Sequence, residues 1–418
     1  MTNRHATPPR PRTARHSRHA THTTHRVLRG TAIAATALLA FGVGSAAATY
    51  ARINGNVSHA DISALVDDED RPTKAANPDD PDAGKDVNIL LLGSDQRDGE
   101  NGDIGGDFGG MRSDTTIVLH ISADRSRVDA ISIPRDSMVD VPSCKLSNGK
   151  HTGSYFGMFN SAFATGWDQG GDIASAVGCT WKTVEKNTGV HIDHSVVVDF
   201  AGFEKMVDAL GGVPICIPNE MISKKAKLHL QAGNQTLDGT QALGFARART
   251  GTGVGDGSDT NRIGRQQQLI AAMVTAILHK NVLTDVGDLL GLLGAATSSL
   301  TTDKGFSLTD MAGLAYTMRD IRGGNITFMT IPWGAYPADH NRVQWTAEAA
   351  TIWDRIANDV PLDGKAEPTS TSTSTSTSAA TPGSTSTSTP KSTPTSTETK
   401  KAGRDAFNLD DSTATCSA

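Results

Sequence analysis

The sequence lacks a strong net charge of either sign. It has 39 Lys and Arg residues against 45 Asp and Glu residues, so the formal net charge is −6 over 418 residues. Proteins that bind nucleic acids derive much of their affinity from excess positive charge, so this composition argues against a nucleic-acid partner. An acidic chain can still bind a small anionic group if its arginines gather in one place, because the planar guanidinium suits phosphate oxygens.

Several widespread catalytic motifs are also missing. The sequence contains neither the Gly-x-Ser-x-Gly elbow of serine hydrolases nor the His-Glu-x-x-His motif of zinc peptidases. The glycine-rich run 251–257 does not follow the strand–turn–helix pattern with a lysine that defines a P-loop, and it is interpreted as a flexible loop. The chemistry of this chain must therefore be sought in a less common arrangement of residues.

Cysteine is scarce, with four residues in the whole chain. No Cys-x-x-Cys pair occurs, and no Cys/His spacing suits zinc. The cysteines fit an oxidising compartment. The preferred disulfide is Cys144–Cys179, with Cys216 as a buried thiol and Cys416 near the C-terminus, although spacing alone does not determine the pairing.

Acidic residues are absent from the N-terminal part until Asp61, whereas arginine is frequent there. The segment Gly30–Tyr50 carries no charge and has about the ~20 residues that a membrane span needs. Positive charge before the span predicts a cytoplasmic N-terminus and a domain outside the cell. The alternative is a cleaved signal peptide with Ser45–Ala48 as its cleavage context, but the apolar stretch is long for that purpose.

Composition divides the chain into five parts. Residues 1–29 form a basic cytoplasmic arm and residues 30–50 form the transmembrane anchor. Residues 51–84 are polar and rich in Asp and Pro, which predicts an extracellular stalk. A single folded domain covers 85–364, and residues 365–418 form a Ser/Thr/Pro-rich tail predicted to be disordered and a candidate for glycosylation.

Strand and helix patterns alternate within the central domain. Asp86–Leu92 is an almost continuous apolar strand, as expected at the centre of a sheet that is covered on both faces. Further strands are predicted at His194–Phe200, Val213–Ile217 and Ile326–Ile331. Helices are predicted at Asp172–Thr188, Gly202–Leu210, Asn261–His279, Leu308–Arg319 and Trp345–Asn358. The expected fold is a three-layer α/β/α domain around a central mixed β-sheet.

The strongest local pattern is a predicted β-hairpin formed by Thr115–Ile121 and Arg127–Ile133. A hairpin brings its two outer ends together, and here those ends carry Arg112, Asp114, Arg135 and Asp136. Charges concentrated where strands end suggest a binding site. Structural salt bridges are an equally acceptable explanation at this level.

Asp95 ends the first strand of the domain, at the position where open α/β sheets place ligands. Together with Asp114 it could hold Mg²⁺, which takes one or two carboxylates along with phosphate oxygens. The alternative is that both aspartates form turns or cap helices.

Two further segments concentrate arginine. Arg247 and Arg249 share a face only if the backbone is extended, so the preceding helix is expected to end near Gly244, with a strand displaying both side chains. The second segment puts polar residues on one helical face that continues as an apolar stripe, namely Asp259, Arg262, Arg265 and Gln266. An ion pair with Asp259 would explain one of these arginines but not both.

Taken in order, these motifs resemble the LytR-CpsA-Psr family. The resemblance covers about Asp86–His279 and includes the anchor, the strand ending in Gly-Ser-Asp, Arg-Ser-Asp-Thr, Ile-Pro-Arg-Asp, Arg-x-Arg and Asp-x-x-Arg-x-x-Arg-Gln-Gln. The segment from His191 to Gly212 matches as well. Where relatives often carry a lysine, this chain has Met158.

The resemblance implies a function outside the cell of Gram-positive bacteria. Members of the family move anionic glycopolymers from a polyprenyl-pyrophosphate carrier to peptidoglycan. Asp95 and Asp114 would hold Mg²⁺, Arg112 would handle a proton or charge, and an apolar groove would take the lipid chain. The pyrophosphate would be bound by Arg135, Arg247, Arg249, Arg262, Arg265 and Gln266.

Two other functions fit the same residues. The site could hydrolyse a polyprenyl pyrophosphate, or the chain could be a non-catalytic regulator that binds lipid or cell wall. Metal dependence separates them, because a regulator should not release polyprenyl phosphate and a transferase should prefer a sugar acceptor to water.

Overall fold

The computed structural model describes residues 57–66, 71–74, 84–95, 111–255, 257–279, 300–362 and 399–411, and the single positions 48, 51, 55, 101, 104, 294, 297, 413 and 416. The chain divides into two compact units, 1–53 and 54–418, and the second is considered below. Apart from position 48, the predicted anchor 30–50 lies outside the described residues. Among the described residues, no helix combines the length and the apolar character needed to cross a membrane.

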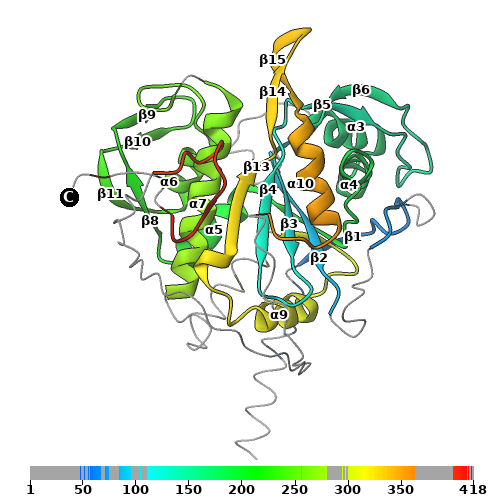
Figure 1. Cartoon of the computed structure of the whole chain (residues 1–418), viewed down its shortest axis with the longest axis horizontal. Helices are drawn as coiled ribbons and strands as arrows, with labels where there is room; N and C mark the ends of the chain where they lie inside the picture. Colours follow the sequence, from blue (N-terminus) through cyan, green and yellow to red (C-terminus); the bar gives the residue numbers. More distant parts are fainter. Residues whose placement is uncertain are drawn as a thin grey trace, which may run out of the picture. The chain divides into compact units, whose positions relative to one another are not determined.

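An eight-stranded mixed sheet forms the centre of the second unit (Figure 1). β2 lies in its middle, as predicted, and pairs with β3 in antiparallel and with β7 in parallel orientation. β3 and β4 are antiparallel neighbours, which confirms the predicted hairpin. Across the sheet the strands are β1 (Ser58–Ala60), β12 (Leu300–Asp303), β7 (His194–Val198), β2 (Val87–Ser94), β3 (Ser113–Ile121), β4 (Val128–Ser132), β13 (Ile326–Thr330) and β16 (Phe407–Asn408).

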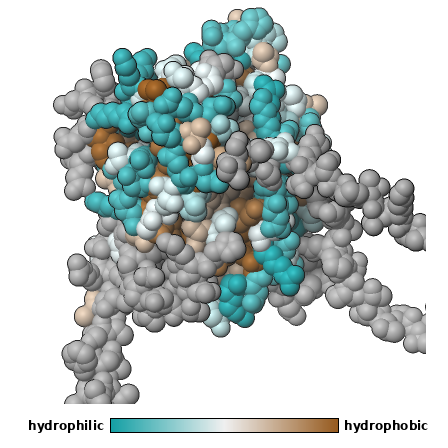
Figure 2. Space-filling view, turned by 90° about the vertical axis from the view of Figure 1, so that its left-hand side faces the viewer, coloured by the Kyte–Doolittle hydropathy of each residue, from teal (hydrophilic) through white to brown (hydrophobic). Residues whose placement is uncertain are grey.

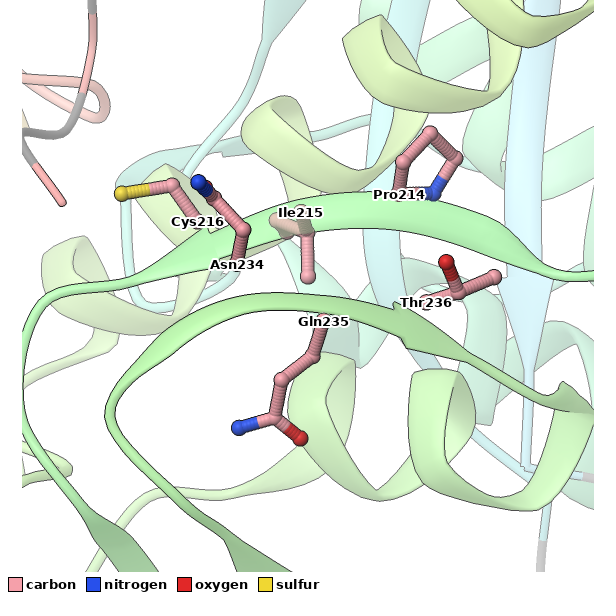
Figure 3. Close-up of a pocket in the computed structure, with 6 residues that line it drawn as sticks. All are labelled: Pro214, Ile215, Cys216, Asn234, Gln235 and Thr236. Carbon is pink, nitrogen blue, oxygen red and sulfur yellow. The ribbon is translucent and has the colours of Figure 1, made fainter. Parts of the chain in front are cut away.

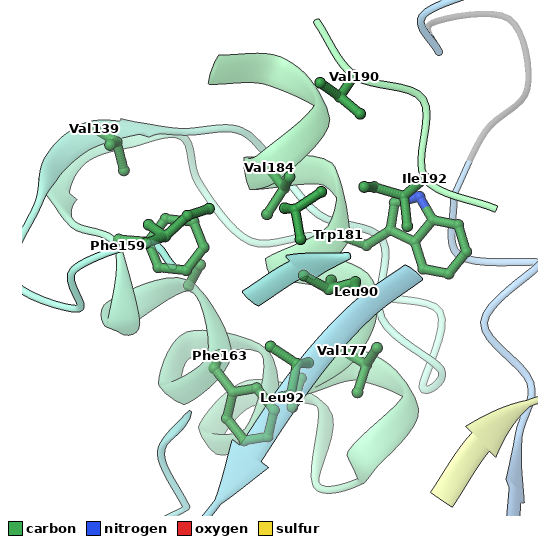
Figure 4. Close-up of a cluster of buried hydrophobic side chains, with 14 of the residues drawn as sticks. Leu90, Leu92, Val139, Phe159, Phe163, Val177, Trp181, Val184, Val190 and Ile192 are labelled. Atoms are coloured by element: carbon green, nitrogen blue, oxygen red, sulfur yellow. The ribbon is translucent and has the colours of Figure 1, made fainter. Parts of the chain in front are cut away.

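Helices cover both faces of this sheet because successive strand residues point to opposite sides. Leu90 and Leu92 belong to a core with α3 (Asn160–Gly170), α4 (Ile173–Thr188) and α10 (Ala347–Ala357), part of which Figure 4 shows. Ile89 belongs to the core of the other face, with α7 (Asp259–His279) and α9 (Leu308–Thr317). This arrangement confirms the prediction of three α/β/α layers around a mixed sheet.

Helix α7 also carries a second, smaller core on its outer side. Ala271 packs toward the sheet, whereas Leu269 belongs to a separate apolar cluster. That cluster is built from α5 (Phe200–Ala209), α6 (Gly239–Arg247), and the hairpins β8 (Val213–Ile217) with β11 (Gly233–Leu237) and β9 (Met221–Ser223) with β10 (Leu228–Leu230). Contacts on two sides fix the position of α7 more firmly than those of a surface helix.

Two further hairpins stand outside the sheet. β5 (Met138–Val141) pairs with β6 (Tyr155–Met158), and β14 (Trp333–Tyr336) pairs with β15 (Asp339–Trp345), which projects clearly from the domain in Figure 1. On the face shown in Figure 2, hydrophobic residues form small separate patches between hydrophilic ones. That distribution is usual for a domain that buries its large apolar side chains.

The observed helix boundaries agree best with the predicted ones where the sequence contains clear capping residues. The side chain of Asp172 accepts a hydrogen bond from the backbone N–H of Ser175 and starts α4, and Gly189 ends it with a left-handed φ of 71°. α10 begins later than predicted, because Trp345 is the last residue of β15. The Pro214 strand, β8, pairs with β11 only, outside the main sheet.

The predicted stalk and tail boundaries are wrong. Residues 57–66 supply β1, and Ile62 and Leu65 are buried in the core next to α4. Near the other end of the chain, β16 pairs with β13, and the ring of Phe407 stacks on Phe328 with centroids 5.4 Å apart. Composition does not indicate these short folded segments, because it is averaged over the long polar stretches in which they lie.

Both disulfides join residues that are distant in sequence. The preferred pair Cys144–Cys179 is confirmed, with Cα atoms 5.2 Å apart. The assignment of Cys216 as a buried thiol is wrong, because it is bonded to Cys416 across 200 residues. Cys416 lies in the segment that composition predicts to be disordered, and the local sequence does not indicate its pairing with a cysteine 200 residues away.

The C-terminal segment should contribute to stability in proportion to the area it buries. Phe407→Ala removes a ring that is only 2% exposed and should destabilise the domain by about 3–5 kcal/mol, as is usual for buried Phe→Ala changes. Chemical denaturation measures the loss. The matched control is Phe156→Ala, because Phe156 is 55% exposed and its removal should cost little. A C-terminal segment that did not belong to the fold would make the two variants equally stable.

Candidate functional site

The candidate site lies at the edge of the sheet where β2 and β4 end and α7 begins. β2 and β4 both run antiparallel to β3, so their carboxyl ends meet at one edge. Asp95 directly follows β2, Arg135 follows β4 after a short turn, and Asp259 opens α7. The N-terminus of a helix favours anions, because its first N–H groups point outward without partners.

A bulge at the start of β3 determines where Asp114 lies. Gly93 pairs with Thr115 but Ser94 pairs with Ser113, so Asp114 is an extra residue opposite the partner strand. A Cβ at position 93 would lie 3.1 Å from Cβ of Thr115, so glycine permits this close pairing. Bulges redirect side chains and leave backbone groups unpaired. Here the freed carbonyl of Asp114 accepts a hydrogen bond from Nη2 of Arg262 at 2.9 Å.

Asp95 and Arg112 form a backbone link at the same end. The N–H of Asp95 donates to the carbonyl of Arg112 at 3.0 Å, and the N–H of Arg112 donates to Oδ1 of Asp95 at 2.6 Å. Asp95 is largely buried, whereas Arg112 is exposed. The predicted pair of aspartates therefore emerges from one bulged strand end.

Three arginines converge on two carboxylates beside this bulge. Nη1 of Arg135 donates to Asp114, as the hairpin predicted. The second carboxylate, Asp259, lies 2.5 Å from Nη2 of Arg262, 3.5 Å from Nη2 of Arg249 and 3.6 Å from Nε of Arg135. Residues from β3, the end of β4, the loop after α6 and α7 thus meet in one charged cluster.

The cluster leaves several buried polar atoms without hydrogen bonds to other described residues. These atoms are Nε of Arg135, Arg249 and Arg262, and both carboxylate oxygens of Asp259. The contacts of Asp259 are therefore ion-pair distances without hydrogen-bond geometry. Buried polar groups are nearly always paired, so orphaned donors at such a place indicate a position meant for a ligand. The orphaned N–H groups suit an anion.

The pKa shifts of the cluster residues also reflect how close these charged groups lie to one another. Burial disfavours ionisation of Asp114, but the charges of Arg262 and Arg135 outweigh it and lower the pKa of this carboxyl. Burial raises the pKa of Asp259 despite its arginine neighbours. Burial, reinforced by repulsion from Arg262 and Arg135, lowers the pKa of Arg249. A negatively charged ligand would relieve the repulsion that Arg249 experiences.

The predicted strand that displays Arg247 and Arg249 together is wrong. α6 continues to Arg247, and only Ala248 turns to extended backbone, with φ −58° and ψ 129°. Arg247 lies over the ring of Phe200 at 4.2 Å and donates to the carbonyl of Ile104, whereas Arg249 contacts Asp259. The change from helix to loop between them separates the two side chains.

Arg265 and Gln266 are also placed differently from the prediction. The guanidinium of Arg265 donates to three backbone carbonyls, at Phe245, Ala248 and Val254. Gln266 donates to the carbonyl of Ala246 at 3.3 Å. Burial, with the charge of Arg262, lowers the pKa of Arg265 to about 10, so it keeps its charge at neutral pH. Both residues fix the end of α6 against α7. Among the residues of the predicted helical face, only Arg262 and Asp259 belong to the charged cluster.

Sequence reasoning missed two features near the cluster. Arg342 of β15 lies 3.8 Å from Asp136, whose other neighbour is Arg135. Gln267, next to the residues singled out, is only 1% exposed and bonds to Ser132 and Thr330 on two strands. The run of adjacent glutamines was a signal for Gln267, but nothing near Arg342 in the sequence distinguished it.

The donor set suits Mg²⁺ with help from a substrate. Among the described residues, no group of three or more His, Cys, Asp or Glu side chains could hold a metal. Two carboxylates lie at this end of the sheet, Asp95 and Asp114, and the charges of Arg262 and Arg135 lower the pKa of Asp114 and keep it ionised. Mg²⁺ binds readily to one or two carboxylates when phosphate oxygens and water complete its shell. The residues therefore fit Mg²⁺ bound together with a phosphorylated ligand.

A pocket of about 300 Å³ lies elsewhere, on the hairpin of β8 and β11 (Figure 3). None of its lining residues is charged: they are Pro214, Ile215, Cys216, Asn234, Gln235 and Thr236. The pocket therefore lacks the charged side chains that characterise the cluster.

Comparison with known proteins finds relatives of two kinds, cell wall biosynthesis proteins and a regulatory protein. The chain is 33% identical over 274 residues to a probable cell wall biosynthesis protein, LcpB of Corynebacterium glutamicum, covering 64% of this chain and 58% of the relative. It is 31% identical to the cell wall biosynthesis protein LcpA of the same organism, covering 59% and 50%. For the regulatory protein MsrR of Staphylococcus aureus the identity is 29%, covering 59% and 64%. The chain thus spans less than two thirds of each relative.

Solved structures share the fold. The LytR-Csp2A-Psr enzyme from Actinomyces oris superposes with a TM-score of 0.52 at 22% identity, covering 72% of this chain and 97% of the other. A family model described as the LytR_cpsA_psr family matches residues 49–355, which is well over half of the 418 residues. The resemblance inferred from the motifs is therefore confirmed: the chain belongs to the LytR-CpsA-Psr family.

Proposed function

We propose that this protein is a membrane-anchored, Mg²⁺-dependent phosphotransferase that moves an anionic glycopolymer from a polyprenyl-pyrophosphate carrier to peptidoglycan outside the cell. The observation that carries the proposal is a group of three arginines whose buried Nε–H groups lack hydrogen-bond partners among the described residues and lie beside two carboxylates. Family membership supports it, as do the names of the corynebacterial relatives, which refer to cell wall biosynthesis.

The arginines would bind the pyrophosphate. Arg135, Arg249 and Arg262 present planar donor groups from three segments, and such forks match phosphate oxygens. In phosphoryl transfer, charge neutralisation and positioning matter more than covalent catalysis. Fixed donors in a largely buried site can supply both without reorganising during the reaction.

The carboxylates would complete the site. Asp95 and Asp114 would hold Mg²⁺, which supplies further neutralisation of the phosphate charge. A hydroxyl of a peptidoglycan sugar would attack the phosphorus that carries the glycopolymer, forming a new P–O bond and losing its proton. The bond to the second phosphate would break, and polyprenyl phosphate would leave. Arg112, which is exposed beside Asp95, would interact with the charge of the leaving phosphate.

Removal of either carboxylate should strongly lower the activity that depends on the metal. Asp95→Asn and Asp114→Asn keep the side-chain size, so release of polyprenyl phosphate should fall by about 100-fold while the melting temperature stays near that of the wild type. A chelator should reduce wild-type activity similarly, and Mg²⁺ should restore it. Asp320→Asn, at a position whose side chain is 84% exposed, is the control. Normal, metal-independent turnover in both site variants would refute the metal assignment.

Substitutions of Arg249 and Arg265 should separate binding from folding. Arg249→Ala removes one of three mutually repelling charges, so stability should be unchanged or higher, whereas affinity for the lipid pyrophosphate should fall at least about tenfold. Arg249→Lys should recover part of this affinity, because lysine keeps the charge but lacks the fork. Calorimetric titration and thermal unfolding measure the two effects.

Arg265→Ala should show the opposite pattern. It leaves three backbone carbonyls without their donor, so it should destabilise the domain by about 3 kcal/mol. If Arg249→Ala unfolds the protein and spares affinity, Arg249 is a structural ion-pair partner and the proposed pyrophosphate site is wrong.

The choice of acceptor should distinguish the alternative functions. A transferase should release polyprenyl phosphate much faster with a peptidoglycan sugar present than with water alone, because the site positions the acceptor hydroxyl. Equal release with water would indicate a pyrophosphatase. Lipid binding without any release would indicate a regulator. Chromatography of labelled polyprenyl phosphate reports all three outcomes.

A further inference from the structure

The described C-terminal residues 399–411, 413 and 416, called the strap below, contact α7 and reach the edge of the sheet (Figure 1). It is attached at widely spaced points. β16 pairs with β13, the carbonyl of Thr413 accepts a hydrogen bond from Gln268 of α7 at 3.1 Å, and Cys416 is bonded to Cys216 of β8. The strap thus joins the main sheet to the smaller core on the other side of α7.

The contact with α7 is closest at its site end. A Cβ added to Gly264 would lie 2.4 Å from the carbonyl oxygen of Ala402. A Cβ added to Gly403 would lie 2.6 Å from the carbonyl oxygen of Thr260. Backbone therefore packs directly on backbone at Thr260 and Gly264, in the part of α7 that also contains Asp259 and Arg262. Gly403 has a φ of 87°, which glycine adopts without strain.

Gln267 links this contact to the strands. Its side-chain oxygen accepts a hydrogen bond from the N–H of Gly403 at 2.9 Å, and its nitrogen donates to Ser132 of β4 at 2.9 Å. β4 leads directly to Arg135. One buried amide thus connects the strap, α7 and the strand that positions an arginine of the cluster.

We propose that the strap is a positioning element for the charged cluster. The strap holds the first turn of α7, and therefore Arg262, against Arg135 and Arg249. This role of the strap depends on the Cys216–Cys416 disulfide. Arg249 is repelled by Arg262 and Arg135, which opposes the close approach of the three side chains. The strap packs on that turn, and the disulfide anchors its end. This inference rests on the proposed function only in assuming that the cluster binds phosphate oxygens.

A pair of glycine variants tests the contact. Gly403→Ala inserts a methyl group between strap and helix, and pyrophosphate affinity should fall about tenfold or more, because small displacements of positioning groups weaken such sites strongly. Gly149→Ala is the matched control: its φ of 79° imposes similar strain, but nothing lies within 4 Å of the added Cβ. Titration calorimetry with inorganic pyrophosphate and Mg²⁺ measures affinity, well below the unfolding temperature.

A pair of disulfide variants tests the anchor. Replacing Cys216 and Cys416 together by Ser should weaken pyrophosphate binding. Replacing Cys144 and Cys179 together by Ser removes a disulfide that joins α4 to the segment after β5, so it should lower stability and leave affinity unchanged. Equal affinity in all four variants and the wild type would overturn the proposal.

Hydrogen exchange provides a measurement that needs no ligand. The amides of α7 between residues 260 and 266 should lose protection in the Gly403 and Cys216/Cys416 variants and keep it in both controls. If wild-type protein fails to bind pyrophosphate, the proposed function is wrong, and the exchange of these amides still decides on the strap. Unchanged protection at these amides would refute the positioning role whatever the binding results.

Discussion

Mutual repulsion among three arginines, of which Arg262 is buried and Arg135 and Arg249 are partly buried, is the constraint on which the candidate site depends. Arg135, Arg249 and Arg262 all lie within 3.6 Å of one carboxylate, Asp259. Two unit charges at about 4 Å interact with about 4 kcal/mol at the effective dielectric of a protein surface. The two carboxylates of the cluster, Asp114 and Asp259, cannot fully offset three such neighbours, so the surrounding framework must hold them. Much of the local architecture is understandable as that framework.

The framework is formed by residues that lie close to the site residues in the sequence and have similar side chains. Arg265 stands three positions after Arg262, yet it donates to three carbonyls at the end of α6 and beyond. Gln266 adds a fourth carbonyl of that region, and Gln267 reaches the strands on the opposite side of the helix. Consecutive turns of α7 therefore serve different purposes: the first turn contributes to the charged cluster, and the second fixes the helix.

Sequence patterns predicted the features that arise from local chemistry. The hairpin of β3 and β4, the caps of α4 and the central position of β2 followed from residue types and periodicity. The same reasoning assigned Arg265 to the site because periodicity identifies a helical face, whereas a long side chain can reach several partners from it. The direction of its guanidinium depends on carbonyls that α6 brings close, which no local pattern encodes.

Long-range pairing explains the remaining differences. β1 and β16 are two- or three-residue strands that exist because a partner strand lies beside them, and neither has a pattern of its own. The bulge at Asp114 likewise depends on the register between two strands. Each of these elements became visible only when segments far apart in the chain were brought together.

The partners of Asp114 give the site a further property. Without ligand, this carboxylate is bonded to Arg135 and lies 3.7 Å from Nη1 of Arg262. A phosphate that takes up these guanidinium groups competes with Asp114 and releases its oxygens. Those oxygens are the ones proposed to hold Mg²⁺, so an anion and a cation should each favour the arrival of the other. Such coupling is reciprocal by thermodynamic necessity, and here it follows from one carboxylate that cannot serve both sets of partners at once.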